Sequence, residues 1–204
     1  MTDPRLVEPG DRAGIVDVLA RAFADDPAFS FIFPDRADRV RRLPRLFALI
    51  YDSDGRAGPR FVTGGGEAVT LWRAPGRAEV GWGEMLLHGL PLLGAFGGAV
   101  FRGLAVADAI ESHFPEGPFW YLHAAACDPA HQGKGHGSAA IRAGITAAPE
   151  GVPCYLETAT EGNLALYMRL GFAITDEWQV PKGGPRFWSM LRSSGAPSPL
   201  MGEG

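Results

Sequence analysis

Residues 120–138 read WYLHAAACDPAHQGKGHGS, and this stretch organises the rest of the chain. Its first eight residues form a mostly apolar run bounded by Pro118 and Asp128, which predicts a central, buried strand. A helix predicted over 138–148 ends before Pro149. The glycines between them let several backbone N–H groups point at one place, beside the positive end of the helix dipole. Lys134 adds a positive charge, so the loop predicts a phosphate site.

The pattern on either side predicts short strands alternating with helices. On the C-terminal side we expect a strand over 154–158, a helix over 164–170 capped by Asn163 and Gly171, and a hairpin of strands at 172–180 and 186–191. On the N-terminal side we expect a strand at 6–8 and then a helix that starts at the cap Asp11 and ends before Asp26. A second helix is expected over 35–51, kinked or split at Pro44. An antiparallel hairpin at 61–63 and 68–72 and one or two helices within 83–109 should follow.

Composition limits the classes of protein that this chain can be. Its 204 residues, 46% hydrophobic and 21% charged, suit one globular domain, expected over 1–192 with a flexible tail at 193–204. The net charge of −4 argues against nucleic acid as a partner. Two cysteines without C-x-x-C spacing, and a start without a signal-peptide pattern, predict free thiols in a reducing cytoplasm. The longest uncharged stretch, 85–101, contains Pro91 and several glycines and makes a poor membrane span.

Two common phosphate loops fit this sequence poorly. A Walker A loop requires G-x-x-x-x-G-K-[ST], whereas Lys134 is followed by Gly135 with no earlier glycine in register. The run from Gly135 to Ala140 matches the dinucleotide fingerprint G-x-G-x-x-A, with Glu157 about 20 residues further on. That fold turns directly from the strand into the first glycine and needs further parallel strand and helix units, which do not follow here. Spacing therefore argues against an NTPase, and topology against a dinucleotide-binding domain.

A third phosphate loop, that of the GNAT N-acetyltransferases, resembles this sequence closely. Residues 132–137 fit that family's Q/R-x-x-G-x-G/A motif. Asn163, Tyr167 and Gly171-Phe172 are similar to its N-x-x-x-Y-x-x-x-G-F segment, and the resemblance spans roughly 119–191. Within the family, segments 22–27, 152–158, 170–172 and 180–190 resemble puromycin N-acetyltransferase and its relatives. Residues 28–116 show no match that identifies the amine substrate.

The resemblance implies both a fold and a cosubstrate. The fold is an α/β (α+β) domain whose mixed, mainly antiparallel central sheet is flanked by helices, with a splay between the strands at 120–127 and 154–158. The cosubstrate is acetyl-CoA, without a metal. The resemblance places its contacts on the splayed strand, the glycine loop and the segment after the second strand: Ala125, Ala126, Cys127, Gln132, Gly133, Lys134, Gly135, His136, Gly137, Ser138, Asn163 and Tyr167.

Tyr167 is the expected catalytic acid. Acetyl transfer from a thioester to an amine needs a neutral amine and an acid for the departing thiolate. By the resemblance, the Tyr167 hydroxyl faces the sulfur, and a phenol can protonate a thiolate. A core aromatic residue with its hydroxyl at the rim is the structural alternative. Asn163, one helical turn earlier, either contacts the cofactor arm or only caps the helix.

His123 is the expected catalytic base. On a regularly alternating strand it shares a face with Ala125, and imidazole takes up protons near neutral pH. No family motif requires this residue, so a core histidine is the alternative. Other groups that can reach the cleft or attract a cationic amine are Tyr121, Glu157, Asp25 and Asp26.

The sequence thus predicts a cytoplasmic enzyme that transfers an acetyl group from acetyl-CoA directly to a primary amine of a small molecule, with antibiotic-like amines among the candidates. A non-catalytic acyl-CoA-binding or sensor module and a protein or peptide N-acetyltransferase are the alternatives. Neither a nucleic acid nor a membrane is expected as a partner. Formation of a homodimer is left open.

Overall fold

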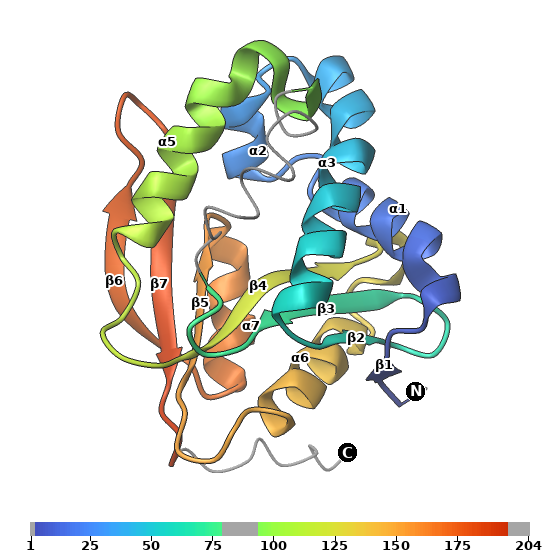
Figure 1. Cartoon of the computed structure of the whole chain (residues 1–204), viewed down its shortest axis with the longest axis vertical. Helices are drawn as coiled ribbons and strands as arrows, with labels where there is room; N and C mark the ends of the chain where they lie inside the picture. The colour runs from blue at the N-terminus through green and yellow to red at the C-terminus, as the bar shows by residue number, and fades with distance from the viewer. Residues whose placement is uncertain (1–2, 79–93, 196–204) are drawn as a thin grey trace.

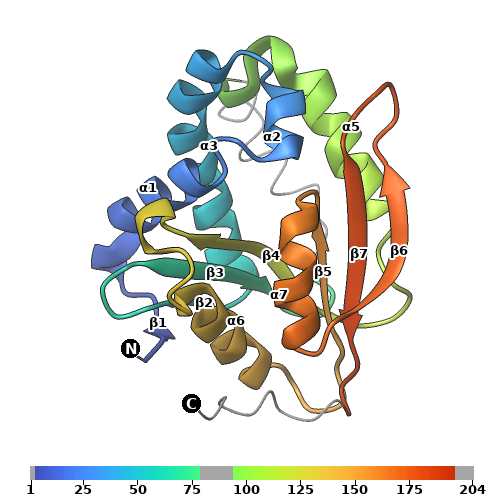
Figure 2. The same cartoon turned by 180° about the vertical axis from the view of Figure 1, so that it is seen from behind.

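The computed structural model describes residues 3–78 and 94–195, which form a central sheet with helices on both faces (Figures 1 and 2). Within these residues the sheet has seven strands in the order β1-β2-β3-β4-β5-β7-β6. Neighbouring strands are antiparallel except β4 and β5, which are parallel. The strands are β1 (Arg5–Leu6), β2 (Arg60–Val62), β3 (Ala68–Arg73), β4 (Trp120–Cys127), β5 (Cys154–Thr158), β6 (Ala173–Gln179) and β7 (Arg186–Arg192).

The helices divide between the two faces of the sheet. Helices α1, α3 and α5 pack on the face seen in Figure 1, and α6 and α7 on the face seen in Figure 2. On the second face, Ile141 and Ile145 of α6 pack against Trp72 and Trp120, which gives the glycine loop a rigid support. The described α-helices are α1 (Arg12–Ala22), α2 (Pro27–Ile32), α3 (Arg36–Ala57), α5 (Val100–Glu111), α6 (His136–Thr146) and α7 (Leu164–Arg169).

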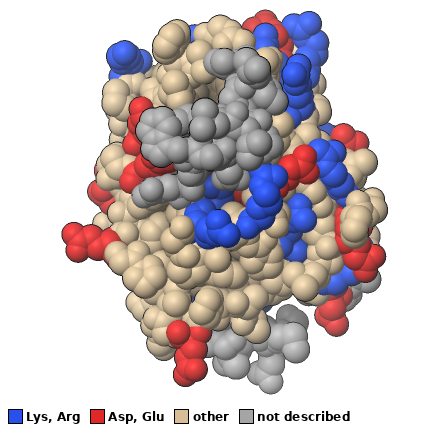
Figure 3. Space-filling model, in the orientation of Figure 1, with Lys and Arg blue, Asp and Glu red and all other residues tan. Residues whose placement is uncertain are grey.

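The surface carries charges of both signs. Figure 3 shows acidic and basic side chains interspersed over the face with α3 and α5, as the near balance of 19 Lys and Arg against 23 Asp and Glu leads one to expect. Within the described residues, no helix combines the length and the apolar character that crossing a membrane requires.

The two parallel strands separate soon after they meet. β4 pairs with β5 only through Trp120 with Cys154 and Tyr121 with Tyr155. Beyond Tyr121, β4 is paired with β3 on one side and has no strand partner toward β5. The splay expected between 120–127 and 154–158 is thereby confirmed, and it leaves peptide groups at the end of β4 available to a ligand.

A β-bulge at His123 changes the face of the sheet to which the following side chains of β4 point. Leu71 pairs with Ala124, but the next residue, Trp72, pairs with Leu122, so His123 is an extra residue opposite β3. Leu122 and Ala125 consequently pack on the α6 side of the sheet. The expectation that His123 shares a face with Ala125 is therefore wrong, because it assumed an unbroken alternation of side chains.

The strands and hairpins predicted from apolar runs are confirmed, while several helix limits differ. The short helix α2 was not expected; Asp26 caps it by accepting bonds from the N–H groups of Ala28 and Phe29, and Pro27 occupies its first position. α3 runs unbroken through Pro44. Proline costs the helix one backbone hydrogen bond, but Leu43 and Phe47 stay buried on either side of it and hold the helix in place. β1 covers 5–6 instead of 6–8, and α6 begins two residues before 138. Residues 83–93 of the expected 83–109 helices, and 196–204 of the expected tail, lie outside the described residues.

Candidate active site

The glycine loop between β4 and α6 has the backbone conformation of an anion cradle. Gly133 and Gly135 have φ angles of 76° and 85°, in the left-handed region where a side chain is strained. Gly135 is the N-cap of α6 and brings no side chain over the first turn of that helix. The first N–H groups of α6 lack partners within the helix and carry its positive dipole end, so they suit a phosphate.

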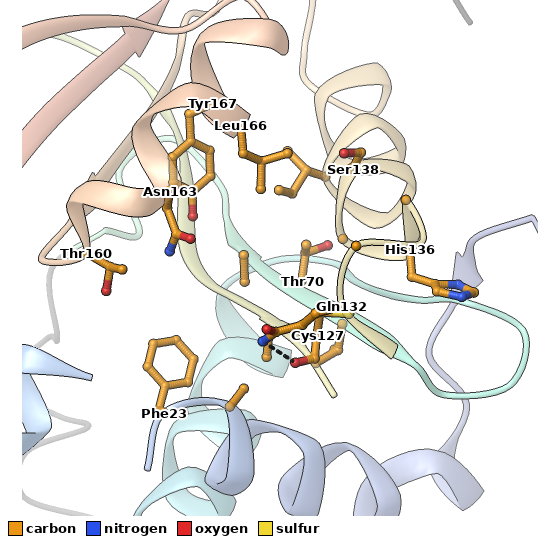
Figure 4. Close-up of a pocket in the computed structure, with 18 of the residues that line it drawn as sticks. Phe23, Thr70, Cys127, Gln132, His136, Ser138, Thr160, Asn163, Leu166 and Tyr167 are labelled. Atoms are coloured by element: carbon orange, nitrogen blue, oxygen red, sulfur yellow. Dashed lines mark hydrogen bonds between the residues drawn. The ribbon is translucent and has the colours of Figure 1, made fainter. Parts of the chain in front are cut away.

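A cavity of about 640 Å³ joins this loop to the end of β4 and to α7 (Figure 4). It is lined by all of the residues expected to bind the cofactor except Lys134, whose exposed ammonium group donates to the carbonyl oxygen of Ala130 at 3.3 Å. The expected residues that line it are Ala125, Ala126, Cys127, Gln132, Gly133, Gly135, His136, Gly137, Ser138, Asn163 and Tyr167.

The splayed end of β4 forms one wall of the cavity. Ala125 and Ala126 have small side chains that leave the backbone approachable. Gln132 reaches back from the loop and donates from Nε2 to the carbonyl oxygen of Cys127 at 3.4 Å (Figure 4). Burial raises the pKa of the Cys127 thiol, so it stays protonated and is a poor nucleophile. This wall can therefore offer peptide groups, rather than reactive side chains, to a ligand.

Tyr167 and Asn163 reach the cavity from the opposite wall. Figure 4 shows the ring of Tyr167 and the amide of Asn163 directed from α7 and its leading turn toward the open space. Tyr167 is buried and packs edge-on against Phe172. Burial raises the pKa of its hydroxyl, and the nearby carboxylates of Glu157 and Asp26 raise it further. The Asn163 side chain makes no capping bond to α7, contrary to its expected role as a cap, and is left to contact a ligand.

The far end of the cavity is bounded by the turn between α1 and α2. Phe23 and Asp26 line it there, together with Thr160, whose hydroxyl lies 3.5 Å from Asp26 Oδ2. Burial raises the pKa of Asp26. Asp25 also lines the cavity, but its carboxylate is bound to the guanidinium group of Arg36 at 2.9 Å. Asp26 is thus the better placed of the two to meet a cationic amine.

A buried group of polar side chains lies on the other face of the sheet, at the level where β4 and β5 part. We call Asp54, Arg73, Tyr121, His123 and Glu157 the polar cluster. Asp54 lies 2.7 Å from His123 Nδ1 and 2.6 Å from Arg73 Nε, and the rings of Tyr121 and His123 are 5.4 Å apart. The bulge places His123 here instead of in the cavity. Among the described residues, no three His, Cys, Asp or Glu side chains are arranged to hold a metal ion.

Glu157 connects the polar cluster with the splay. Its Oε1 accepts a hydrogen bond from the Tyr121 hydroxyl, whereas Oε2 is buried and has no hydrogen-bond partner among the described residues. Burial raises the pKa of Glu157 to about 8, and the bond from Tyr121 only partly offsets this. With this pKa the Glu157 carboxyl holds a proton near neutral pH, at the edge of the opened strands.

The raised pKa of Glu157 predicts a dependence of stability on pH. The folded protein binds this proton more tightly than the unfolded chain does, so the resulting stability is complete below the ordinary pKa and is lost as pH rises toward about 8. Between about pH 5 and about pH 8.5, urea denaturation should show the wild type losing at least about 1 kcal/mol more than Glu157→Gln. Glu161→Gln, which changes an exposed glutamate, should follow the wild type. If Glu157→Gln also follows it, the burial of this carboxyl is wrong.

Comparisons with known proteins agree with this arrangement. Residues 88–172 match the family model for the acetyltransferase (GNAT) family. The structure resembles that of a protein from Corynebacterium glutamicum described as histone acetyltransferase HPA2 and related acetyltransferase, with a TM-score of 0.72, 29% identity, and coverage of 95% of this chain and 97% of that one. The chain has the GNAT fold, and the matched segment indicates a transferase. The fold and the enzyme class expected from the sequence are confirmed, whereas a particular likeness to puromycin N-acetyltransferase is not shown.

More distant solved structures share the GNAT fold. Arylalkylamine N-acetyltransferase 2 from Aedes aegypti has a TM-score of 0.58 at 12% identity, covering 94% of this chain and 98% of that one. The ribosomal-protein-S18-alanine N-acetyltransferase from Escherichia coli has a TM-score of 0.52 at 17% identity, covering 100% of this chain and 97% of that one. By their names, these two proteins act on different kinds of amine, so the shared fold leaves the acceptor of this chain undefined.

Proposed function

We propose that this protein is an acetyl-CoA-dependent N-acetyltransferase that acetylates a primary amine of a small molecule by direct transfer. The observation that carries the proposal is one continuous cavity, which runs from the glycine cradle past the splayed end of β4 to the buried hydroxyl of Tyr167. A pyrophosphate at one end and a thioester at the other would span this path. The family as a whole supports acetyl-CoA as the donor.

The cofactor fits the residues that are present. The pyrophosphate would accept hydrogen bonds from the amides of the loop around Gly133 and Gly135, where positive φ angles keep side chains away. The pantetheine arm would lie along Ala125 and Ala126 and bond the peptide groups that β5 leaves unpaired. Peptide N–H groups along this edge would also polarise the acetyl carbonyl.

The chemistry that follows takes two protons from the nitrogen and gives one to the sulfur. The neutral amine nitrogen attacks the carbonyl carbon, and the C–S bond breaks as the C–N bond forms. The thiolate takes the proton of Tyr167, while the second proton of the nitrogen passes to solvent, from which Tyr167 is protonated again; burial that raises the pKa of Tyr167 also raises that of the departing thiol, so the transfer stays feasible. The first proton, which the ammonium group loses before the attack, goes to the polar cluster, where the imidazole of His123 can accept it.

The end of the cavity favours a small acceptor. Phe23 and Asp26 from the turn between α1 and α2 line this end, with Thr160 beside Asp26, so a compact amine would lie next to an aromatic ring and a carboxylate. A cationic, partly aromatic amine satisfies both groups.

The proposal is tested by measuring CoA release from acetyl-CoA with a panel of amines. The panel would contain puromycin-like aminonucleosides, arylalkylamines, polyamines and, for comparison, lysine-containing and N-terminal peptides. We expect acetylation of at least one small amine, verified by mass spectrometry, with peptides turning over at least about 100-fold more slowly in kcat/KM. Binding of acetyl-CoA without any turnover would point to a sensor module, and a preference for peptides would contradict the small-molecule assignment.

A further inference from the structure

Asp54 is a charged residue in a position where the pattern of α3 calls for an apolar one. Leu43, Phe47, Tyr51 and Asp54 follow one another at helical spacing and are all buried on the inner face of the helix. The Asp54 side chain is 0% exposed. A buried carboxylate costs stability unless it is paired, and packing alone gives no reason for it here. Its contacts within the polar cluster therefore indicate a functional reason.

The carboxylate of Asp54 determines which nitrogen of His123 carries a hydrogen. Burial alone would raise the pKa of Asp54, but the neighbouring His123 and Arg73 lower it below its ordinary value, so the group is ionised. An ionised carboxylate can only accept hydrogen bonds. Both Asp54 oxygens lie within 2.9 Å of His123 Nδ1, so Nδ1 must be the donor. A neutral imidazole has one N–H, which leaves Nε2 without a hydrogen.

We infer that Asp54 is a positioning residue that holds His123 with its hydrogen on Nδ1, so that Nε2 is the nitrogen that takes up the proton released by the amine. This inference rests on the proposed function. His123 lies beside Tyr121 on the face where the splay begins, and its side chain is 26% exposed, so it can pass the proton on to solvent. Asp54 then pairs with the imidazolium that forms.

The charges around His123 are consistent with this role. Among the described residues, Asp54 from α3 bonds to His123 and Tyr121 from β4 lies beside it. Arg73 from β3 is bound to Asp54, and Glu157 from β5 is bound to Tyr121. Arg73 Nε is bound to Asp54 and its Nη1 donates to the carbonyl oxygen of Ala78, which fixes the guanidinium group away from His123 Nδ1. Arg73 balances the charge of Asp54 through Oδ1, and the other carboxylate oxygen, Oδ2, stays available to His123.

The test compares Asp54→Asn with Asp52→Asn. Asparagine keeps the shape, and because Arg73 Nε needs its oxygen as an acceptor, its NH2 group would face His123 Nδ1; this would reverse the tautomer of His123 and leave Nε2 protonated. We expect kcat to fall at least about 30-fold in Asp54→Asn while the acetyl-CoA dissociation constant stays within about twofold of the wild type, which also shows that the variant folds. Asp52 lies on the same helix and pairs with Arg12 near the surface, so Asp52→Asn should retain the wild-type kcat.

A second measurement reads the tautomer without needing catalysis. In wild-type protein labelled with 15N-histidine, long-range nitrogen–proton spectra should show His123 with a protonated Nδ1 and an unprotonated Nε2, and Asp54→Asn should show the reverse. A protonated Nε2 in the wild type, or wild-type kcat in a folded Asp54→Asn, would overturn the inference. The proposed function is tested separately by the amine panel, and absence of turnover by the wild type with every amine would overturn it.

Discussion

Replacing Tyr167 with Phe is expected to lower kcat at least about tenfold and to leave the dissociation constant for acetyl-CoA within about twofold of the wild type. The substitution keeps the ring that packs against Phe172 and removes only the hydroxyl that faces the cavity. Without that proton the thiolate must depart unprotonated, which raises the barrier to breaking the C–S bond. Binding changes little because the cradle and the end of β4 hold most of the cofactor.

A matched control separates loss of this hydroxyl from loss of a buried tyrosine in general. Tyr51 is also buried, on α3, where the guanidinium group of Arg60 lies 4.0 Å from the centre of its ring. It does not line the cavity. Tyr51→Phe should keep the wild-type kcat when CoA release is measured under the same conditions. Equal kcat in Tyr167→Phe and Tyr51→Phe would remove Tyr167 from the role of acid.

Gly135→Glu is expected to weaken acetyl-CoA binding by about 100-fold or more. At a φ of 85° a side chain costs about 1–2 kcal/mol in backbone conformation, and the new carboxylate would stand at the N-terminus of α6, where the pyrophosphate must bind. Repulsion between the two anions adds to the steric loss. Calorimetric titration with acetyl-CoA measures the effect.

Gly151 provides the control for this substitution. Its φ of 78° is nearly the same, a side chain there would meet no atom within 4 Å, and it lies outside the cavity. Gly151→Glu should therefore carry a similar conformational cost and bind acetyl-CoA as the wild type does. If Gly135→Glu binds equally well, the pyrophosphate does not lie on this loop.

Most of the sheet could be predicted from the sequence because its central strands β3, β4 and β5 are largely apolar runs bounded by prolines, glycines or charges. β4 and β5 were expected at the bounds that the structure has, since Pro118 and Asp128 delimit the first of them. The helices were harder to predict from the sequence. α2 has six residues, too few for a periodic pattern, and the extension of α3 past Pro44 depends on tertiary burial that no local propensity contains.

The cavity could be predicted better than the polar cluster. The glycine loop and Tyr167 belong to two separate motifs, which the resemblance to the GNAT family assigned to one cofactor, and both line the same cavity. The facing of His123 depends on one extra residue in β4, and nothing in the sequence marks a bulge there. Asp54 was missed altogether, although a signal exists: it interrupts the apolar stripe of α3, where a charged residue is out of place. Its contacts with Arg73 and His123 depend on how α3 packs on the sheet, which the sequence does not show.

The account depends most directly on the binding of acetyl-CoA by the wild-type protein, measured by calorimetric titration with CoA and NADH as comparison ligands. We expect a dissociation constant in the range of about 1–100 µM for acetyl-CoA at a stoichiometry of one, similar binding of CoA, and no heat from NADH beyond dilution. Absence of acetyl-CoA binding would contradict both the cradle and the proposed activity. Tight binding of NADH instead would mean that the glycine loop holds a dinucleotide.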